Sequence, residues 1–187
     1  MFNKNAPQVA SLLLSEPFML DPNFQRSVIL LCEHSEEGTV GYVLNQPAVL
    51  QLSDVMAELP EATYPLFIGG PVSNDSLHFI HKCPDKLPGG ADLGNGLHWG
   101  GNFETLTILA RNNQIGHDEI KFFLGYSGWS PGQLDRELTE NTWAVTNTYN
   151  PDITLGADHE NLWKEAVVAL GEKYAHVANF PQNPMWN

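Results

Sequence analysis

The sequence predicts a single α+β domain built on a mixed, coiled β-sheet, and two patterns carry this prediction. Apolar, β-rich runs separated by turn signals fill the first half of the chain, whereas strands and amphipathic helices mix in the second half. The elements therefore do not follow the strand–helix alternation of a doubly wound parallel sheet. A length of 187 residues is typical of one domain, and no linker or internal repeat divides residues 1–187.

Apolar runs bounded by turn residues mark the expected strands. Gln8–Leu14 is apolar enough for a strand, and Ser27–His34 is typical of a strand buried on both faces. Glu36-Glu37-Gly38 forms a turn that leads into a strand over Thr39–Asn45, which is the strongest hairpin signal in the chain. Later strands are expected over Tyr64–Ile68, Leu77–His81, Leu97–Trp99, Ile120–Tyr126 and Trp143–Thr148.

About four helices are expected. One covers Ser53–Leu59, and apolar residues at helical spacing predict another over Phe103–Asn112. Asp158 caps the last helix and Gly171 ends it, after which an apolar tail follows.

The remaining helix has three agreeing start signals. Ser130 can cap it, Pro131 suits the first helical position, and Gln133 can complete a capping box. We therefore expect this helix to begin directly after the strand that ends at Tyr126.

Charge and cysteine usage limit the function classes. Nine Lys and Arg stand against 22 Asp and Glu, for a formal net charge of −13, and a chain this acidic repels DNA and anionic membranes. We expect a small molecule or a protein as partner, no direct contact with nucleic acid or membrane, no cofactor, and a monomer. The two cysteines form no disulfide framework and no secretory leader opens the chain, so a cytoplasmic location is expected.

A serine offers the first alternative, which is hydrolase chemistry. Ser127 lies in Gly125-Tyr126-Ser127-Gly128-Trp129 at a strand end, as the nucleophile of a hydrolase elbow does. However, Trp129 stands where that motif requires its second glycine. The other interpretation is a tight turn that the glycines permit.

Two mirrored segments offer thiol or metal chemistry. Cys32-Glu33-His34 and His81-Lys82-Cys83 each can present one thiolate and one imidazole on a strand face, and together they would supply a zinc set. Because Cys32 lies in an apolar run, we instead expect it to be a buried, unmetallated thiol, and we predict no metal site. Cys83 precedes Pro84 in an expected loop, so thiol reagents should reach it.

Four stretches together match a known family: Asp21–His34, Gly41–Pro47, Gly69–Val72 and Gly125–Leu134. In this order the chain resembles the AlgH/YqgE family of bacterial proteins over residues 10–170, with a tail at 171–187. The resemblance implies one cytoplasmic α+β domain with coiled, mixed sheets. Most members are uncharacterised, and the name-giving branch is described as a regulator of alginate production, without established catalytic residues. The resemblance therefore favours a non-enzymatic binding or regulatory domain that affects gene expression indirectly, with an enzyme using Ser127 or Cys32 as the alternative.

The family motifs supply the candidate ligand-binding residues. Their polar side chains lie beside apolar strands and need partners, while their glycines permit close backbone approach. The set is Arg26, Asn45, Gly69, Gly70, Tyr126, Gly128, Trp129 and Gln133. We expect the site at the turn Gly125–Gly132, near the helix N-terminus, with Tyr126 and Trp129 as flat walls. The competing interpretation is that both aromatic residues belong to the core.

Overall fold

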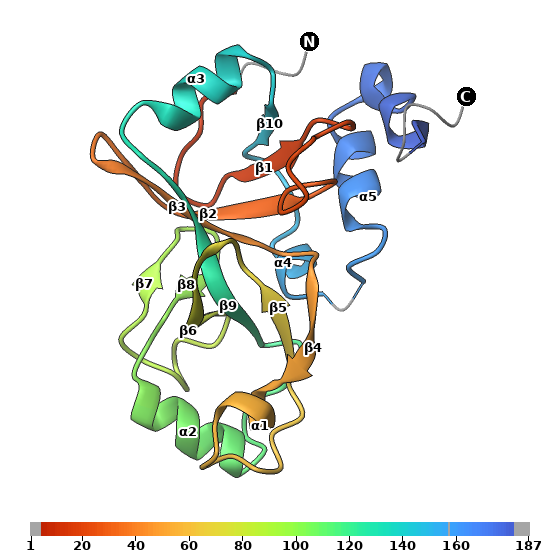
Figure 1. Ribbon diagram of the computed structural model, residues 1–187. Coiled ribbons are helices and arrows are strands. Elements are labelled where there is room, and N and C mark those ends of the chain that lie inside the picture. The colour runs from red at the N-terminus through yellow and green to blue at the C-terminus, as the bar shows by residue number, and fades with distance from the viewer. Residues whose placement is uncertain (1–4, 157, 182–187) are drawn as a thin grey trace.

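The computed structural model describes residues 5–156 and 158–181, which form two lobes joined by one long strand (Figure 1). The upper lobe in this view contains β1 (Leu12–Ser15), β2 (Val28–Ser35), β3 (Gly38–Val43), β10 (Trp143–Thr146), α3 (Gln133–Thr139) and α5 (Leu162–Ala169). The lower lobe contains β4 (Pro47–Gln51), α1 (Leu52–Val55), β5 (Pro65–Ile68), β6 (Val72–His81), β7 (Ala91–Asp92), β8 (His98–Trp99) and α2 (Phe103–Arg111). Between the lobes lies α4 (Asp152–Leu155), and two 3-10 turns, Glu172–Tyr174 and Val177–Asn179, follow α5.

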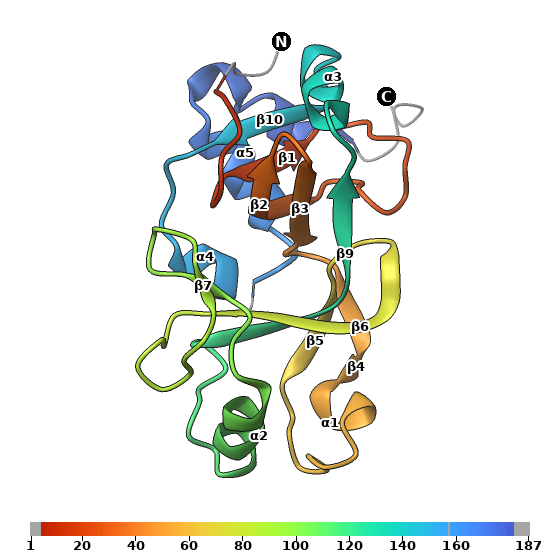
Figure 2. The ribbon, with the colours of Figure 1, turned by 90° about the vertical axis from the view of Figure 1, so that its left-hand side faces the viewer.

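The joining strand is β9 (Ile120–Trp129), which belongs to both lobes (Figure 2). Its first half pairs in parallel with β5 and antiparallel with β6, and its last residues pair antiparallel with β3. The main path of the sheet is β10-β1-β2-β3-β9-β6-β8-β7, and β4 and β5 branch from β9. One parallel pair among antiparallel ones makes the sheet mixed, so the predicted α+β class is confirmed.

The predicted hairpin is confirmed, because β2 and β3 pair with Ser35 opposite Gly38. The strand predicted over Ile120–Tyr126 is longer than expected. It continues as β9 to Trp129, because residues 127–129 pair with β3 where the pairing with β6 ends. The helix start at Ser130 is wrong. Gln133 N–H donates to the Ser130 carbonyl at 2.9 Å, closing a turn in which Gly132 has φ +71°, and α3 begins only at Gln133.

Two further elements escape the sequence patterns. The strand β4 pairs with β5 although Val49 and Leu50 are exposed, and its apolar run of only three residues follows a proline, a residue type that is rare in strands. The helix α4 has only four residues, which is too short for a periodic pattern. At the last helix, Asn161 rather than Asp158 is the N-cap, and the Asp158 carboxylate accepts from Asn161 N–H at 3.2 Å.

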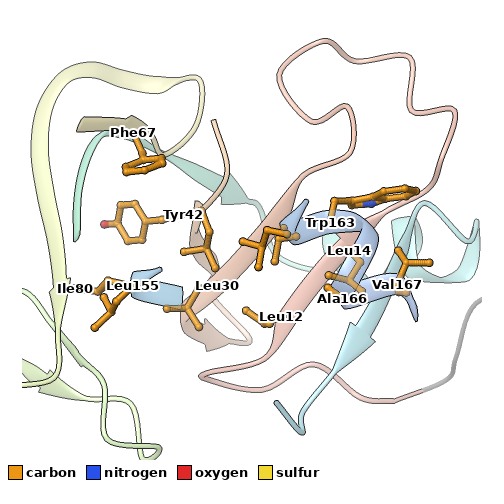
Figure 3. Close-up of a cluster of buried hydrophobic side chains, with 14 of the residues drawn as sticks. Leu12, Leu14, Leu30, Tyr42, Phe67, Ile80, Leu155, Trp163, Ala166 and Val167 are labelled. Carbon is orange, nitrogen blue, oxygen red and sulfur yellow. The ribbon is translucent and has the colours of Figure 1, made fainter. Parts of the chain in front are cut away.

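Alternation along β2 divides the core between two faces of the upper lobe. Val28 and Leu30 point to a cluster that continues between the lobes, whereas Ile29 and Leu31 point to the side covered by α3. All four side chains are fully buried, and burying an aliphatic side chain of this size contributes about 1.5–3 kcal/mol. Figure 3 shows the first cluster, which brings residues of both lobes into contact with α4 and α5.

The C-terminal segment packs on the domain as far as residue 181. Tyr174 and Ala178 are buried in the inter-lobe cluster, and Phe180 stacks on Phe18 with ring centroids 5.5 Å apart. The tail expected after Gly171 is therefore part of the folded body over its described residues. None of the helices in residues 5–156 and 158–181 has the length and apolar character needed to cross a bilayer.

Candidate functional site

Two glycines of the candidate set, Gly69 and Gly70, lie at the crossing of the two lobes. A Cβ atom on Gly69 would overlap the Gly125 carbonyl oxygen, and one on Gly70 would overlap the Tyr126 carbonyl group. Gly125 itself has φ +67°, a conformation that strongly favours glycine. The backbones of two chain segments thus approach each other closely here, and this approach accounts for Gly69, Gly70 and Gly125 without a ligand.

Ser127 is built into the same crossing. Its side chain is fully buried, and its hydroxyl donates to the Gly69 carbonyl oxygen at 3.0 Å. The same carbonyl accepts from Val43 N–H at 2.9 Å, so Ser127 helps to fix β5 against β3. A hydroxyl committed in this way does not face a substrate, and the hydrolase elbow has no support in the geometry.

Trp129 and Gln133 belong to a partly buried polar network around Glu137. Trp129 is only 6% exposed, and the indoles of Trp129 and Trp143 both donate to Glu137 Oε2, at 2.9 and 2.7 Å. Gln133 donates to Glu137 Oε1 at 2.9 Å and accepts from Ser130 N–H at 3.0 Å. The prediction that Trp129 forms an open wall is therefore wrong, because its indole packs in the core and its N–H is satisfied there.

Asn45 joins two strands at the opposite end of β3. Its side-chain oxygen accepts from Val28 N–H at 2.9 Å, and its Nδ2 donates to the Arg26 carbonyl at 2.9 Å. The Arg26 guanidinium then turns toward the C-terminal segment, where Nη2 donates to the Phe180 carbonyl. Apart from Tyr126 and Gly128, the candidate residues thus fall into three separate places: the lobe crossing, the Glu137 network and the Arg26 region.

An open groove lies where the sequence placed the site. It has a volume of about 510 Å³ and runs between the β2–β3 hairpin and the end of β9. Its lining residues are Glu33, Glu37, Gly38, Thr39, Val40, Val72, Tyr126, Gly128, Trp129, Ser130 and Pro131. Of the candidate set, Tyr126 and Gly128 line it with surface left to contact a partner.

Carboxylates and apolar side chains together give this groove its chemistry. Glu33 and Glu37 are exposed at its rim, and Val72 is 37% exposed beside the half-buried Tyr126. Neither glutamate belongs to the candidate set that the sequence motifs supply. The groove as built suits a partner that brings positive charge and an apolar or aromatic surface.

The mirrored Cys and His segments do not meet. Cys32 belongs to the inter-lobe cluster and Cys83 to the separate cluster under α2. Cys83 contacts His81 instead, with Sγ and Nδ1 3.7 Å apart, while His81 Nε2 lies 3.0 Å from the Gly100 carbonyl. Within residues 5–156 and 158–181, no three His, Cys, Asp or Glu side chains are placed to share a metal ion.

Comparison with known proteins places this geometry in a family. Residues 12–175 match the DUF179 family model, described as AlgH-like. The chain belongs to the AlgH-like family. A UPF0301 protein of Chlorobaculum tepidum is 39% identical over 176 residues, which cover 94% of each chain. A UPF0301 protein of Parabacteroides distasonis is 40% identical over 189 residues, which cover 99% of this chain and 94% of the relative.

Two solved structures resemble the AlgH-like domain. The solution structure of the AlgH protein from Pseudomonas aeruginosa has a TM-score of 0.72 at 28% identity, covering 96% of this chain and 98% of that one. The crystal structure of protein DIP2367 from Corynebacterium diphtheriae has a TM-score of 0.78 at 24% identity and covers 95% of both chains. At that identity, the second comparison supports the fold alone.

One buried charge in the AlgH-like chain lies at a position that the sequence patterns do not single out. Lys121 is 4% exposed, its Nζ donates to the Gly156 carbonyl at 3.2 Å, and Nζ lies 3.9 Å from the centre of the Phe67 ring. Burial lowers the pKa of this lysine to about 7. The available signal was a charged residue inside the otherwise apolar run of Ile120–Leu124.

Neither cysteine of the AlgH-like domain is exposed, which corrects the expectation for Cys83. Cys32 is 5% exposed and Cys83 is 7% exposed, and burial raises the pKa of both thiols. The Cys83 loop folds back on itself, because Lys86 N–H and Leu87 N–H both donate to the Cys83 carbonyl.

We expect Ellman's reagent to modify neither cysteine in the native protein and both after unfolding in guanidinium, since the reagent needs an accessible thiolate. Absorbance at successive reaction times measures this. A rapid native phase that disappears in Cys83→Ser would show that the Cys83 loop opens, and would contradict the buried geometry.

Proposed function

We propose that this AlgH-like chain is a non-enzymatic binding domain whose groove between the β2–β3 hairpin and β9 receives a basic segment of a protein partner. The open groove of about 510 Å³ carries this proposal. Its rim glutamates and the net charge of −13 favour Lys and Arg, and Tyr126 offers a ring face for a cationic side chain.

The two alternative catalytic residues give little support to an enzyme. The Ser127 hydroxyl is buried against the Gly69 carbonyl, and the Cys32 thiol is buried with a raised pKa. A nucleophile must reach its substrate and be activated by a base or a lowered pKa. A binding role needs neither, and a protein partner would allow this acidic domain to affect gene expression without touching DNA. Reduced, unpaired cysteines also fit the proposed cytoplasmic location.

The test uses a short fluorescent peptide of alternating Arg and Leu as the probe. Replacing both rim carboxylates, Glu33→Gln with Glu37→Gln, is expected to weaken binding about fivefold at physiological salt, since exposed ion pairs contribute about 0.2–1 kcal/mol each. Fluorescence anisotropy measures the affinity.

A charge-matched control distinguishes binding in the groove from long-range attraction by the net negative charge of the whole chain. Glu58→Gln with Glu61→Gln removes the same charge from a different cavity, which lies in the lower lobe between the α1–β5 connection and α2, and is expected to change affinity less than about twofold. Equal weakening by both pairs would mean that long-range charge alone attracts the peptide, and would refute the groove. Duplex DNA should bind no better than about micromolar.

A further inference from the structure

The last residues of β9 have a neighbouring strand on one side. Ser127, Gly128 and Trp129 pair with β3, whereas on the other side β6 pairs no further along β9 than Tyr126, which lies opposite Val72. Figure 2 shows β3 beside this end of β9 while β6 curves away from it. Within residues 5–156 and 158–181, no other strand takes the place of β6 there.

The backbone groups of β3 alternate between its two neighbours. At the end of this strand, Leu44 N–H donates to the Val28 carbonyl on β2, whereas Val43 N–H donates to the Gly69 carbonyl on the opposite side. Successive residues of a strand direct their N–H and C=O groups to opposite edges. The even-numbered residues of β3 therefore face β2, and its odd-numbered residues face β9.

The same alternation fixes the direction of the Gly128 backbone groups. The odd-numbered residues of β3 lie opposite Ser127 and Trp129, which direct their own N–H and C=O groups toward β3. Gly128 lies opposite Val40 and therefore points its N–H and C=O away from β3, to the side that β6 leaves open. Gly128 is exposed, so a partner chain can reach both groups, as at the edge of any open sheet.

The groove of the proposed function adjoins this open edge. Glu33, Val40 and Gly128 are cross-strand neighbours on one face of the sheet, and Tyr126 lies on the same face two residues before Gly128. Gly128 has no side chain to shield the neighbouring ring, since a Cβ there would lie 3.3 Å from Tyr126 Cε2. The residues that line the groove include two glutamates and no Lys or Arg, so its charge is complementary to a basic segment.

We propose that the partner segment binds as an added β-strand alongside the end of β9, with its backbone hydrogen-bonded to the N–H and C=O of Gly128. This inference rests on the proposed function, because it concerns the same groove and the same basic occupant. In such complexes main-chain hydrogen bonds supply affinity and alternate side chains supply specificity. The favoured occupant is therefore an extended segment with Lys or Arg at every second position, facing Glu33 and the Tyr126 ring.

The experiment compares two isomers of the fluorescent Arg-Leu peptide, one N-methylated at every Arg and the other at every Leu. The isomers share composition and charge, but methylation blocks opposite edges of an extended strand. In an antiparallel strand with Arg facing the groove, the Arg N–H groups face β9. The Arg-methylated isomer should therefore bind wild-type protein at least about tenfold more weakly than the Leu-methylated isomer. Fluorescence anisotropy measures both affinities, and a reversed difference of this size would support a parallel added strand.

Hydrogen exchange in the ¹⁵N-labelled full chain gives a readout on the protein side. The Gly128 amide should exchange rapidly in the free protein, and about tenfold more slowly with unmethylated peptide at ten times its dissociation constant. The Ser127 and Trp129 amides, which face β3, should exchange slowly in both states and serve as internal controls.

A pair of variants at one position adds a third readout. Gly128→Pro removes the outward N–H, which the pairing with β3 does not use, and proline is tolerated in strands at such edge positions. It should weaken binding of the unmethylated peptide at least about tenfold. The matched control is Gly128→Ala, which keeps the N–H and whose Cβ meets only the Tyr126 ring within 4 Å, and it should weaken binding less than about threefold.

Equal affinities of the two methylated isomers, or a Gly128 amide that is already protected in the free protein, would overturn the added strand. If the unmethylated peptide still binds in a manner that depends on Glu33 and Glu37, the proposed function survives that outcome. If the unmethylated peptide does not bind, the proposed function and the added strand both fail. The peptide comparison needs only the wild-type protein, so it stays decisive even if Gly128→Pro fails to fold.

Discussion

Gly70→Ala is expected to destabilise the domain by at least about 3 kcal/mol, because overpacking against rigid backbone exceeds the usual cost of an added methyl group. A Cβ at this position would overlap the Tyr126 carbonyl group and the Ser127 nitrogen. Those backbone atoms belong to β9, the strand that joins both lobes, so they cannot move without disturbing the pairing of β3, β5 and β6. Urea unfolding followed by tryptophan fluorescence measures the change in the free energy of unfolding.

Gly96→Ala is the matched control for this substitution. Gly96 also has a positive φ, +86°, but a Cβ there meets nothing within 4 Å. Gly96→Ala should therefore lower the free energy of unfolding only by the cost of a positive φ at a non-glycine residue, about 1–2 kcal/mol. If both alanine variants lose the same stability, close approach at the lobe crossing is not what requires Gly70.

Lys121→Met is expected to stabilise the protein by about 1–3 kcal/mol at pH 6, as replacement of a buried charge by an apolar side chain of similar volume often does. Below pH 7 the folded state carries a buried ammonium group that, among residues 5–156 and 158–181, donates one hydrogen bond, to the Gly156 carbonyl, and also contacts the Phe67 ring. Methionine keeps the stem that packs in the core and removes the charge.

The stabilisation by Lys121→Met should decrease as the pH rises. Burial lowers the folded-state pKa of Lys121 from 10.5 to about 7, so between these values the unfolded chain binds a proton that the folded chain does not. Wild-type stability therefore rises with pH in this window relative to the variant. The advantage of Lys121→Met is full below pH 7 and is lost as the pH approaches 10.5.

Thermal unfolding of both proteins between pH 6 and pH 10 measures this difference, with Lys164→Met as the control for removing an exposed lysine. A variant that is less stable than wild type at pH 6, or whose difference from wild type does not change with pH, would show that the ammonium group is adequately solvated in the folded state.

The candidate site shows which features local sequence patterns can predict and which depend on the fold. Tyr126 and Gly128 line an open groove, in keeping with the general rule that a strand end followed by a turn lies at the surface. Trp129 was misplaced because β9 continues past Tyr126, and strand residues three positions apart face opposite sides, so Trp129 packs in the core. Glu33 and Glu37 are absent from the sequence-derived candidates, because only the fold brings them beside Tyr126.

The sequence by itself determined the α+β class, the β2–β3 hairpin, α2 and the family, because these depend on local periodicity, turn chemistry and linear motifs. Only the tertiary structure decided the roles of the motif residues. Gly70 approaches a strand 56 positions later in the chain, Arg26 meets Phe180, and Lys121 meets Gly156. Such pairings come from the path of β9 through both lobes and from the docking of the C-terminal segment, and long-range contacts of this kind leave no pattern in neighbouring residues.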